Sequence, residues 1–166
     1  STDLPVMLYD IPGRAGIAMT TDTIVRLAEH ERVVAMKDAK HDLEASSWVL
    51  SRSDIAYYSG DDAWTLPLLA IGGVGVVGTS THLVAARTQQ LIEAFFAGDL
   101  AKARALHSAL LPIYSGIFRA PGTILVKAAL ELLGFPVGGV RLPLVPATPE
   151  EREQLALDLK AAGVLS

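Results

Sequence analysis

Short apolar runs alternate with amphipathic segments over the first 98 residues of the chain. Four runs are four to seven residues long, rich in β-branched or aromatic residues and closed by turn-forming or polar residues, which predicts buried strands. These runs are 5–11, 33–38, 55–59 and 75–78. The amphipathic segments between and after them predict helices over 21–29, 42–50, 64–71 and 83–97.

Beyond residue 98 the strand pattern stops and only helical periodicity remains. Helices are predicted over 99–114, 122–133 and 148–162. Gly98 follows directly on the helix predicted for 83–97 and is typical of a helix C-terminus, while Thr148-Pro149-Glu150 is a start signal. The buried side of the 42–50 helix is expected to include Trp48 and Val49.

Strand and helix alternate four times, which indicates βαβ units and a parallel α/β sheet. Four parallel strands leave two open edges, and two architectures remain open at this point. One is a small doubly wound sheet, and the other is half of a (β/α)8 barrel, which typically needs about 250 residues. The helical segment from residue 99 is expected to pack onto the sheet rather than to form a free domain.

Composition narrows the class of protein. The 166 residues are 51% hydrophobic and only 6% aromatic, so the core should be aliphatic. A net charge of −4 argues against a nucleic-acid or anionic-membrane partner, which would favour a basic surface. The chain has no cysteine, no basic-then-apolar signal segment and no run of 18 apolar residues, so a soluble, cytoplasmic protein is expected.

The sequence does not support three common kinds of site, namely a dinucleotide site, a metal site and a serine-hydrolase site. Residues 73–78 match the G-x-G-x-x-G dinucleotide fingerprint, but a predicted helix precedes them where that fingerprint needs a strand. The glycines are therefore expected to permit close packing. No pair of histidines has a helical ligand spacing, and Asp61-Asp62 is better explained as a helix cap, so no metal is predicted. No G-x-S-x-G sequence occurs.

The strongest candidate for chemistry is Lys37, which ends the apolar run Val33–Met36. Such a lysine lies at the carboxyl edge of a parallel sheet, where α/β proteins place their active sites. Its ordinary pKa is about 10.4, so it acts as a neutral nucleophile at neutral pH only where the site lowers that pKa. Tyr9 ends the preceding strand and Arg14 follows it, a combination that suits an imine-forming enzyme acting on keto acids. The alternative, that Lys37 only marks where the strand meets water, stays open on this run alone.

Four motifs together resemble the dihydrodipicolinate synthase family. They are YDIPGRAG (9–16), VVAMKDA (33–39), YYSGDD (57–62) and GGVGVVG (72–78). Members of this family are pyruvate-dependent class I lyases built on a (β/α)8 barrel with a C-terminal helical extension. The resemblance implies that residues 1–98 supply strands five to eight of the barrel and that residues 99–166 form the extension. Asp10 stands where the family more often has asparagine.

The same resemblance implies a role for five residues. Lys37 matches the amine that forms a Schiff base with pyruvate, and Tyr9 matches the phenol that relays protons. Arg14 matches the group that receives the carboxylate of aspartate semialdehyde, and it favours the synthase over sister enzymes. Gly60 matches a small residue lining the pyruvate pocket, and Val77 the position whose backbone carbonyl faces pyruvate. No external cofactor is implied, because Lys37 itself forms the covalent imine.

The resemblance also implies partners. The family's pyruvate-carboxylate loop and the rest of its proton relay belong to the first half of the barrel, so an N-terminal half-barrel is an expected partner, and a homotetramer or homodimer is expected beyond it. Two alternatives remain. One is a sister pyruvate aldolase or dehydratase of the neuraminate-lyase or keto-sugar-acid type, and the other is a non-catalytic half-barrel fragment.

Overall fold

The computed structural model describes residues 3–166, which divide into two compact units at Gly78/Thr79. The first unit contains the strands, and the regular secondary structure of the second consists of helices within the described residues. This division follows the density of packing, since helix α5 (Thr81–Phe96) packs most extensively against helix α6 (Leu100–Gly116). The assignment of 1–98 to a barrel and 99–166 to an extension rests on a different criterion, the family resemblance, and stays a prediction.

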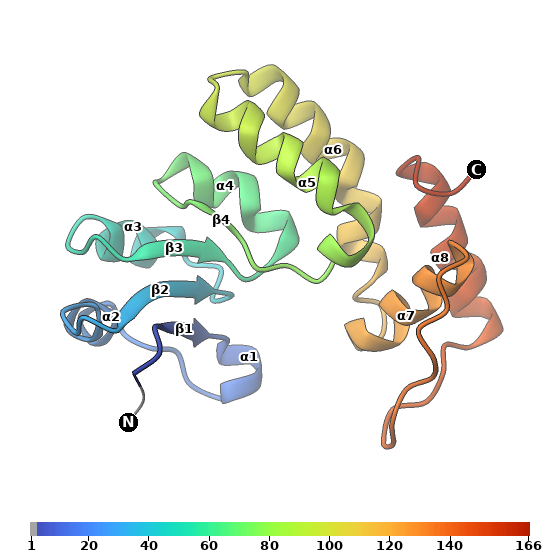
Figure 1. Cartoon of the computed structure of the whole chain (residues 1–166), viewed down its shortest axis with the longest axis horizontal. Helices are drawn as coiled ribbons and strands as arrows, with labels where there is room; N and C mark the ends of the chain where they lie inside the picture. The colour runs from blue at the N-terminus through green and yellow to red at the C-terminus, as the bar shows by residue number, and fades with distance from the viewer. Residues whose placement is uncertain (1–2) are drawn as a thin grey trace. The chain divides into compact units, whose positions relative to one another are not determined.

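The first unit is a four-stranded parallel sheet in the order β1-β2-β3-β4, each strand followed by helical structure (Figure 1). The predicted α/β class and parallel sheet are therefore confirmed. The strands are β1 (Val6–Asp10), β2 (Val33–Asp38), β3 (Ala56–Ser59) and β4 (Gly75–Val76). The helices are α1 (Pro12–Ala15), α2 (Thr21–Ala28), α3 (Leu43–Leu50), the 3₁₀ turn η1 (Asp62–Trp64) and α4 (Thr65–Ala70).

The two faces of this sheet differ, because successive side chains of a strand point to opposite sides. On the covered face, Met36 and Tyr57 are fully buried and pack with Ile24 of α2 and Val49 of α3. The opposite side is called the open face here. It carries the row Tyr9–Lys37–Tyr58–Gly75, which is in register across all four strands, and Tyr9 is 47% exposed.

Local rules explain the starts of two helices in the first unit. Thr20 accepts a hydrogen bond from the Thr23 N–H, and Asp42 from the Ala45 N–H, so each caps a helix as this residue type favours. The predicted buried position of Trp48 is wrong, because its side chain is 54% exposed. The buried stripe of α3 runs through Ser46 and Val49, which are three residues apart, and Trp48 falls outside it.

The second unit consists of α5, α6, α7 (Gly122–Leu132) and α8 (Pro149–Ala161). Its core contains fully buried side chains from all four helices, among them Leu91, Leu110, Leu125 and Leu155. Gly98 ends α5 with a φ of +79°, and Thr148 forms a reciprocal capping box with Glu151 at the start of α8. Both predicted helix boundaries are confirmed. No helix among residues 3–166 is long and apolar enough to cross a bilayer.

Candidate active site

Lys37 and Tyr9 lie side by side on the open face, each one residue before the end of its strand. They are direct partners in the β1–β2 register. The Lys37 Nζ lies 4.1 Å from the centroid of the Tyr9 ring, a cation–π distance. The structure thus brings the predicted amine and phenol together, at the carboxyl edge of the sheet and on a side that a small molecule can reach.

The loops that follow β3 and β4 approach the same edge. The Gly60 N–H donates to the Asp38 carbonyl over 2.7 Å, and a Cβ at Gly60 would stand only 3.0 Å from Ala39 Cβ and from that carbonyl. Glycine is thus required by the close approach of two strand ends. The Val77 N–H donates to the Ser59 carbonyl over 2.8 Å and continues the β3–β4 pairing by one residue.

Arg14 is the remaining predicted site residue, and it lies beyond the end of β1 rather than on a strand. It belongs to the four-residue helix α1 and is exposed, and within residues 3–166 no ion pair involves its guanidinium. The sequence pattern predicted no helix between residues 11 and 21, so this helix was missed. Proline at its first turn and Gly16 at its end, with a φ of +79°, are the signals that could have found it.

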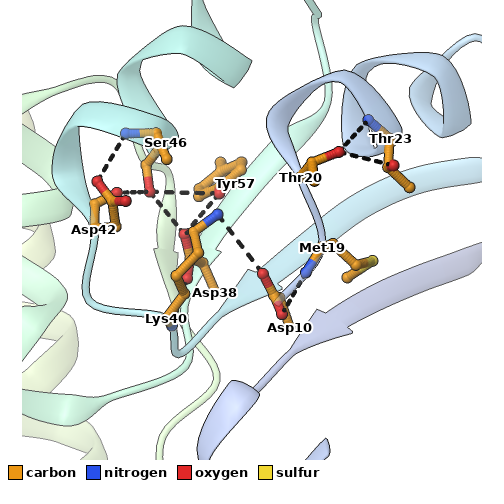
Figure 2. Close-up of polar contacts among 10 residues, drawn as sticks. Asp10, Met19, Thr20, Thr23, Asp38, Lys40, Asp42, Ser46 and Tyr57 are labelled. Atoms are coloured by element: carbon orange, nitrogen blue, oxygen red, sulfur yellow. Dashed lines mark hydrogen bonds and ion pairs between the residues drawn. The ribbon is translucent and has the colours of Figure 1, made fainter. Parts of the chain in front are cut away.

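A buried ion cluster lies directly behind Lys37 and Tyr9, on the covered face. It consists of Asp10, Asp38 and Lys40 (Figure 2). Asp10 and Asp38 are 2% and 6% exposed and are partners in the strand register. The Lys40 Nζ lies 3.6 Å from Asp10 Oδ2 and 3.9 Å from Asp38 Oδ2, and its side chain is 8% exposed.

Asp38 is held by three further donors. The Ser46 hydroxyl and the Tyr57 hydroxyl each donate to its Oδ2 over 2.7 Å, and the Lys40 N–H donates to its Oδ1 over 2.7 Å. Burial and, next, the hydrogen bond to the Asp38 carboxylate raise the pKa of Tyr57 far above its ordinary value of 10, so this phenol stays a neutral donor. The carboxylate is therefore fixed in one orientation.

This cluster was not predicted from the sequence. Strand alternation could have found half of it, because Asp10 and Asp38 each follow a residue assigned to the active edge and must point to the opposite face. The contribution of Lys40 carries no such signal, since it depends on how the chain turns after β2.

Helix α4 precedes β4 and no helix opens at residues 73–78, so the dinucleotide fingerprint lacks its structural context, as predicted. A Cβ at Gly78 would collide with Asp62 Oδ1, which confirms that close packing requires glycine there. Asp61 accepts from the Ala63 N–H and caps η1, as expected. Among residues 3–166 no group of three His, Asp or Glu side chains is arranged to hold a metal ion.

The comparisons with known proteins agree on one family. The family model described as "Dihydrodipicolinate synthetase family" matches residues 1–162. The chain is 61% identical over 163 residues to the 4-hydroxy-tetrahydrodipicolinate synthase of Acidothermus cellulolyticus, covering 98% of this chain and 53% of that protein. It is 53% identical to the 4-hydroxy-tetrahydrodipicolinate synthase 2 of Streptomyces coelicolor, covering 97% of this chain and 54% of that protein.

Solved structures agree. The dihydrodipicolinate synthase of Cyanidioschyzon merolae with lysine bound superposes with a TM-score of 0.94 at 44% identity, covering 98% of this chain and 56% of that chain. The Thermotoga maritima dihydrodipicolinate synthase gives a TM-score of 0.94 at 35% identity, covering 99% of this chain and 58% of that chain. The chain thus spans about half the length of the relatives that it matches.

Proposed function

Because this chain belongs to the dihydrodipicolinate synthetase family, we propose that Lys37 is the amine with which a lysine-pathway synthase binds pyruvate covalently. The observation that carries the proposal is the Lys37–Tyr9 pair, with an amine 4.1 Å from a phenol ring at the carboxyl edge of a parallel sheet. Relatives at 45–61% identity are named 4-hydroxy-tetrahydrodipicolinate synthases, which are lyases.

The proposed reaction uses the amine throughout. Lys37 adds to the carbonyl carbon of pyruvate and water leaves, so that a protonated imine forms. The positive nitrogen acidifies the pyruvate methyl group, and loss of a proton gives an enamine whose carbon attacks the aldehyde of aspartate semialdehyde. Water then cleaves the carbon–nitrogen bond, releases the product for cyclisation and returns Lys37 as a free amine. In this proposal Tyr9 carries protons to and from this nitrogen, and no external cofactor is needed.

The remaining site residues have proposed roles in binding. In this proposal Gly60 lets the loop after β3 lie close against the end of β2 and so lines the pyruvate pocket without a side chain. Val77 continues the strand edge and offers its backbone carbonyl to the substrate. Arg14 is exposed and without an ion pair within residues 3–166, so its guanidinium is free to receive the carboxylate of the aldehyde substrate.

We also propose that four further strand–helix units close this sheet into a (β/α)8 barrel. The support is the open face, where Tyr9 and Met7 are 47% and 42% exposed, together with a match to little more than half of each relative. In this proposal the first half of the barrel supplies the loop that grips the pyruvate carboxylate. The "completed barrel" is defined here as this chain joined behind the part of the Acidothermus relative that it does not match.

Reduction of the imine tests the function. The completed barrel and the chain alone are incubated with pyruvate and borohydride, and peptide mapping by mass spectrometry locates the adduct. We expect a pyruvyl adduct on Lys37 in the completed barrel and none in its Lys37→Arg variant, because arginine stays protonated above pH 12. The Lys102→Met variant, which removes an exposed lysine of α6, is the control. An adduct on a different lysine, or an equal yield from Lys37→Arg, contradicts the proposal.

Assembly and location are proposed from the family alone. A homotetramer or homodimer in the cytoplasm is expected, although one similar solved structure, 36% identical with a TM-score of 0.92, is described as a monomeric dihydrodipicolinate synthase variant. Size-exclusion chromatography of the completed barrel with in-line light scattering measures the number of subunits.

A further inference from the structure

We propose that Lys40 is a positioning residue, whose ammonium group bridges Asp10 and Asp38 and so sets both the alignment of the Tyr9–Lys37 pair and the negative charge behind it. The second effect rests on the proposed role of Lys37 as the imine-forming amine. The first, the alignment of two strand ends, stands on the structure of the cluster alone.

The geometry of the strand ends creates the need for a bridging cation. Asp10 and Asp38 lie on adjacent strands in direct register and point to the same buried side. Neighbouring strands are about 4.8 Å apart, so two uncompensated carboxylates would repel each other strongly there. The Lys40 ammonium lies within 4 Å of both, and Figure 2 shows it reaching across between the two strand ends.

The two carboxylates depend on Lys40 to different degrees. Asp38 accepts hydrogen bonds from Ser46, Tyr57 and its own turn, whereas Asp10 accepts one, from the Met19 N–H over 3.2 Å. Within residues 3–166, the buried Asp10 Oδ2 has no hydrogen-bond donor and its charge is offset by Lys40. Removal of the lysine therefore leaves the buried Asp10 carboxylate, at the end of β1, without a compensating positive charge.

Each aspartate is also the chain neighbour of a proposed active-site residue. Asp10 follows Tyr9 and Asp38 follows Lys37, on opposite faces of their strands. Electrostatic repulsion between the two carboxylates would push the two strand ends apart. The Tyr9 phenol would then lie farther from the Lys37 amine. The Lys40 hydrogen bond from its own backbone to Asp38 over 2.7 Å fixes the turn that returns its side chain to this position.

The cluster also determines the local charge. Asp10, Asp38 and Lys40 together carry one net negative charge. From β3 the cluster faces the neutral Tyr57, and from α3 it faces the hydroxyl of Ser46. His41 and Asp42 line the same small hollow as Asp38, with His41 in contact with Asp61 at the surface. Loss of the Lys40 charge adds one net negative charge behind Lys37, which favours the protonated amine over the nucleophilic one.

The test measures the pH dependence of pyruvate trapping by borohydride in the completed barrel. For Lys40→Met we expect the midpoint of the acid limb of this pH profile to rise by about 0.5–1 pH unit, on the scale of one added negative charge at the distance of an adjacent strand residue. Lys40→Arg keeps the charge and should stay close to wild type. The double variant Asp10→Asn/Lys40→Met restores one net negative charge, so its midpoint should return to within about 0.2 pH unit of wild type.

If Lys40 only stabilised the fold, Lys40→Met would lower the yield of trapped pyruvate at every pH without shifting the midpoints of the pH profiles. Unshifted midpoints in Lys40→Met, or no return in the double variant, overturn the proposal. If Lys40→Met does not fold, Asp10→Asn and the double variant still differ by the Lys40 charge alone, and equal midpoints in those two proteins overturn it. Lys102→Met is again the control for loss of an exposed lysine.

The melting temperatures of the same variants separate this proposal from the proposed function. Absence of any adduct on wild-type Lys37 refutes the function and leaves the bridge to be judged by stability. In that case Lys40→Met should melt well below wild type, and the double variant should recover at least half of the difference. Equal melting temperatures of wild type and Lys40→Met overturn the bridge itself.

Discussion

Replacement of Tyr57 by phenylalanine removes a single oxygen atom from the buried core of the sheet. Tyr57 is fully buried and its hydroxyl donates to the Asp38 carboxylate over 2.7 Å. Phenylalanine keeps the ring and its packing with Met36, so the change removes the hydrogen bond to Asp38 and a longer one of 3.5 Å to the Ser46 hydroxyl. A hydrogen bond to a charged partner contributes about 1.5–3 kcal/mol, and Tyr57→Phe should lower the free energy of unfolding of the completed barrel by that amount at pH 7.

The effect should also depend on pH in a way that identifies its cause. The pKa of Tyr57 is raised in the folded protein, chiefly by burial, while in the unfolded chain it is about 10. The stabilisation is therefore complete below pH 10 and is lost as the pH rises above 10, where only the unfolded chain releases the proton. The difference in unfolding free energy between wild type and variant should shrink with pH at a slope approaching about 1.4 kcal/mol per pH unit.

Urea unfolding followed by circular dichroism from pH 7 to pH 11 measures both quantities. Tyr58→Phe is the matched control, because Tyr58 is the next residue of β3, points to the open face and is only partly buried. A loss of less than about 0.5 kcal/mol at pH 7, below the range for even a neutral hydrogen bond, would refute the reasoning. A difference that stays constant up to pH 11 would mean that Tyr57 ionises as easily in the fold as outside it.

Three further predictions concern other parts of the chain. Arg14→Ala should raise the KM for the aldehyde about 10- to 150-fold, the equivalent of one lost charge-assisted contact, and leave the KM for pyruvate nearly unchanged; equal effects on both would indicate a structural arginine. The 17.6 kDa chain alone should not be a folded monomer, because its open face leaves apolar side chains exposed; a monomer by light scattering with one sharp melting transition would contradict the barrel proposal. Burial lowers the pKa of His107, so the stability it contributes is present above about pH 6.5 and is lost as the pH falls below that, and His107→Gln should flatten this fall in urea titrations between pH 7 and pH 5.

Sequence reasoning located the proposed amine and phenol because both signals are local. An apolar run that ends in lysine specifies a strand and its edge, and the pairing of Tyr9 with Lys37 then follows from the parallel order of consecutive strands. Helix caps such as Asp42 and Thr148 were equally accessible, since a cap is decided within four residues.

Features that depend on contacts between residues far apart in the sequence could not be predicted from local patterns. The Lys40–Asp10 ion pair joins positions 30 residues apart through the path of a turn, and no periodicity encodes that path. The exposure of Trp48 is a similar case. Its hydrophobicity suggested the core, but the stripe through Val49 was already complete and the indole lies under the Arg52 guanidinium instead, 5.2 Å from ring centroid to Cζ.

The opposite orientation of Lys37 and Asp38 means that an insertion in β2 is more disruptive than a substitution on its open face. One residue added or removed between Val34 and Lys37 would turn the amine into the covered face and Asp38 onto the open face, since strand periodicity is two. Substitutions on the open face, in contrast, leave the covered face as it is. A laboratory or natural lineage could therefore change the chemistry of this edge by replacing side chains at positions 9, 37 and 58, while the length of the strand and the aspartates behind it stay fixed.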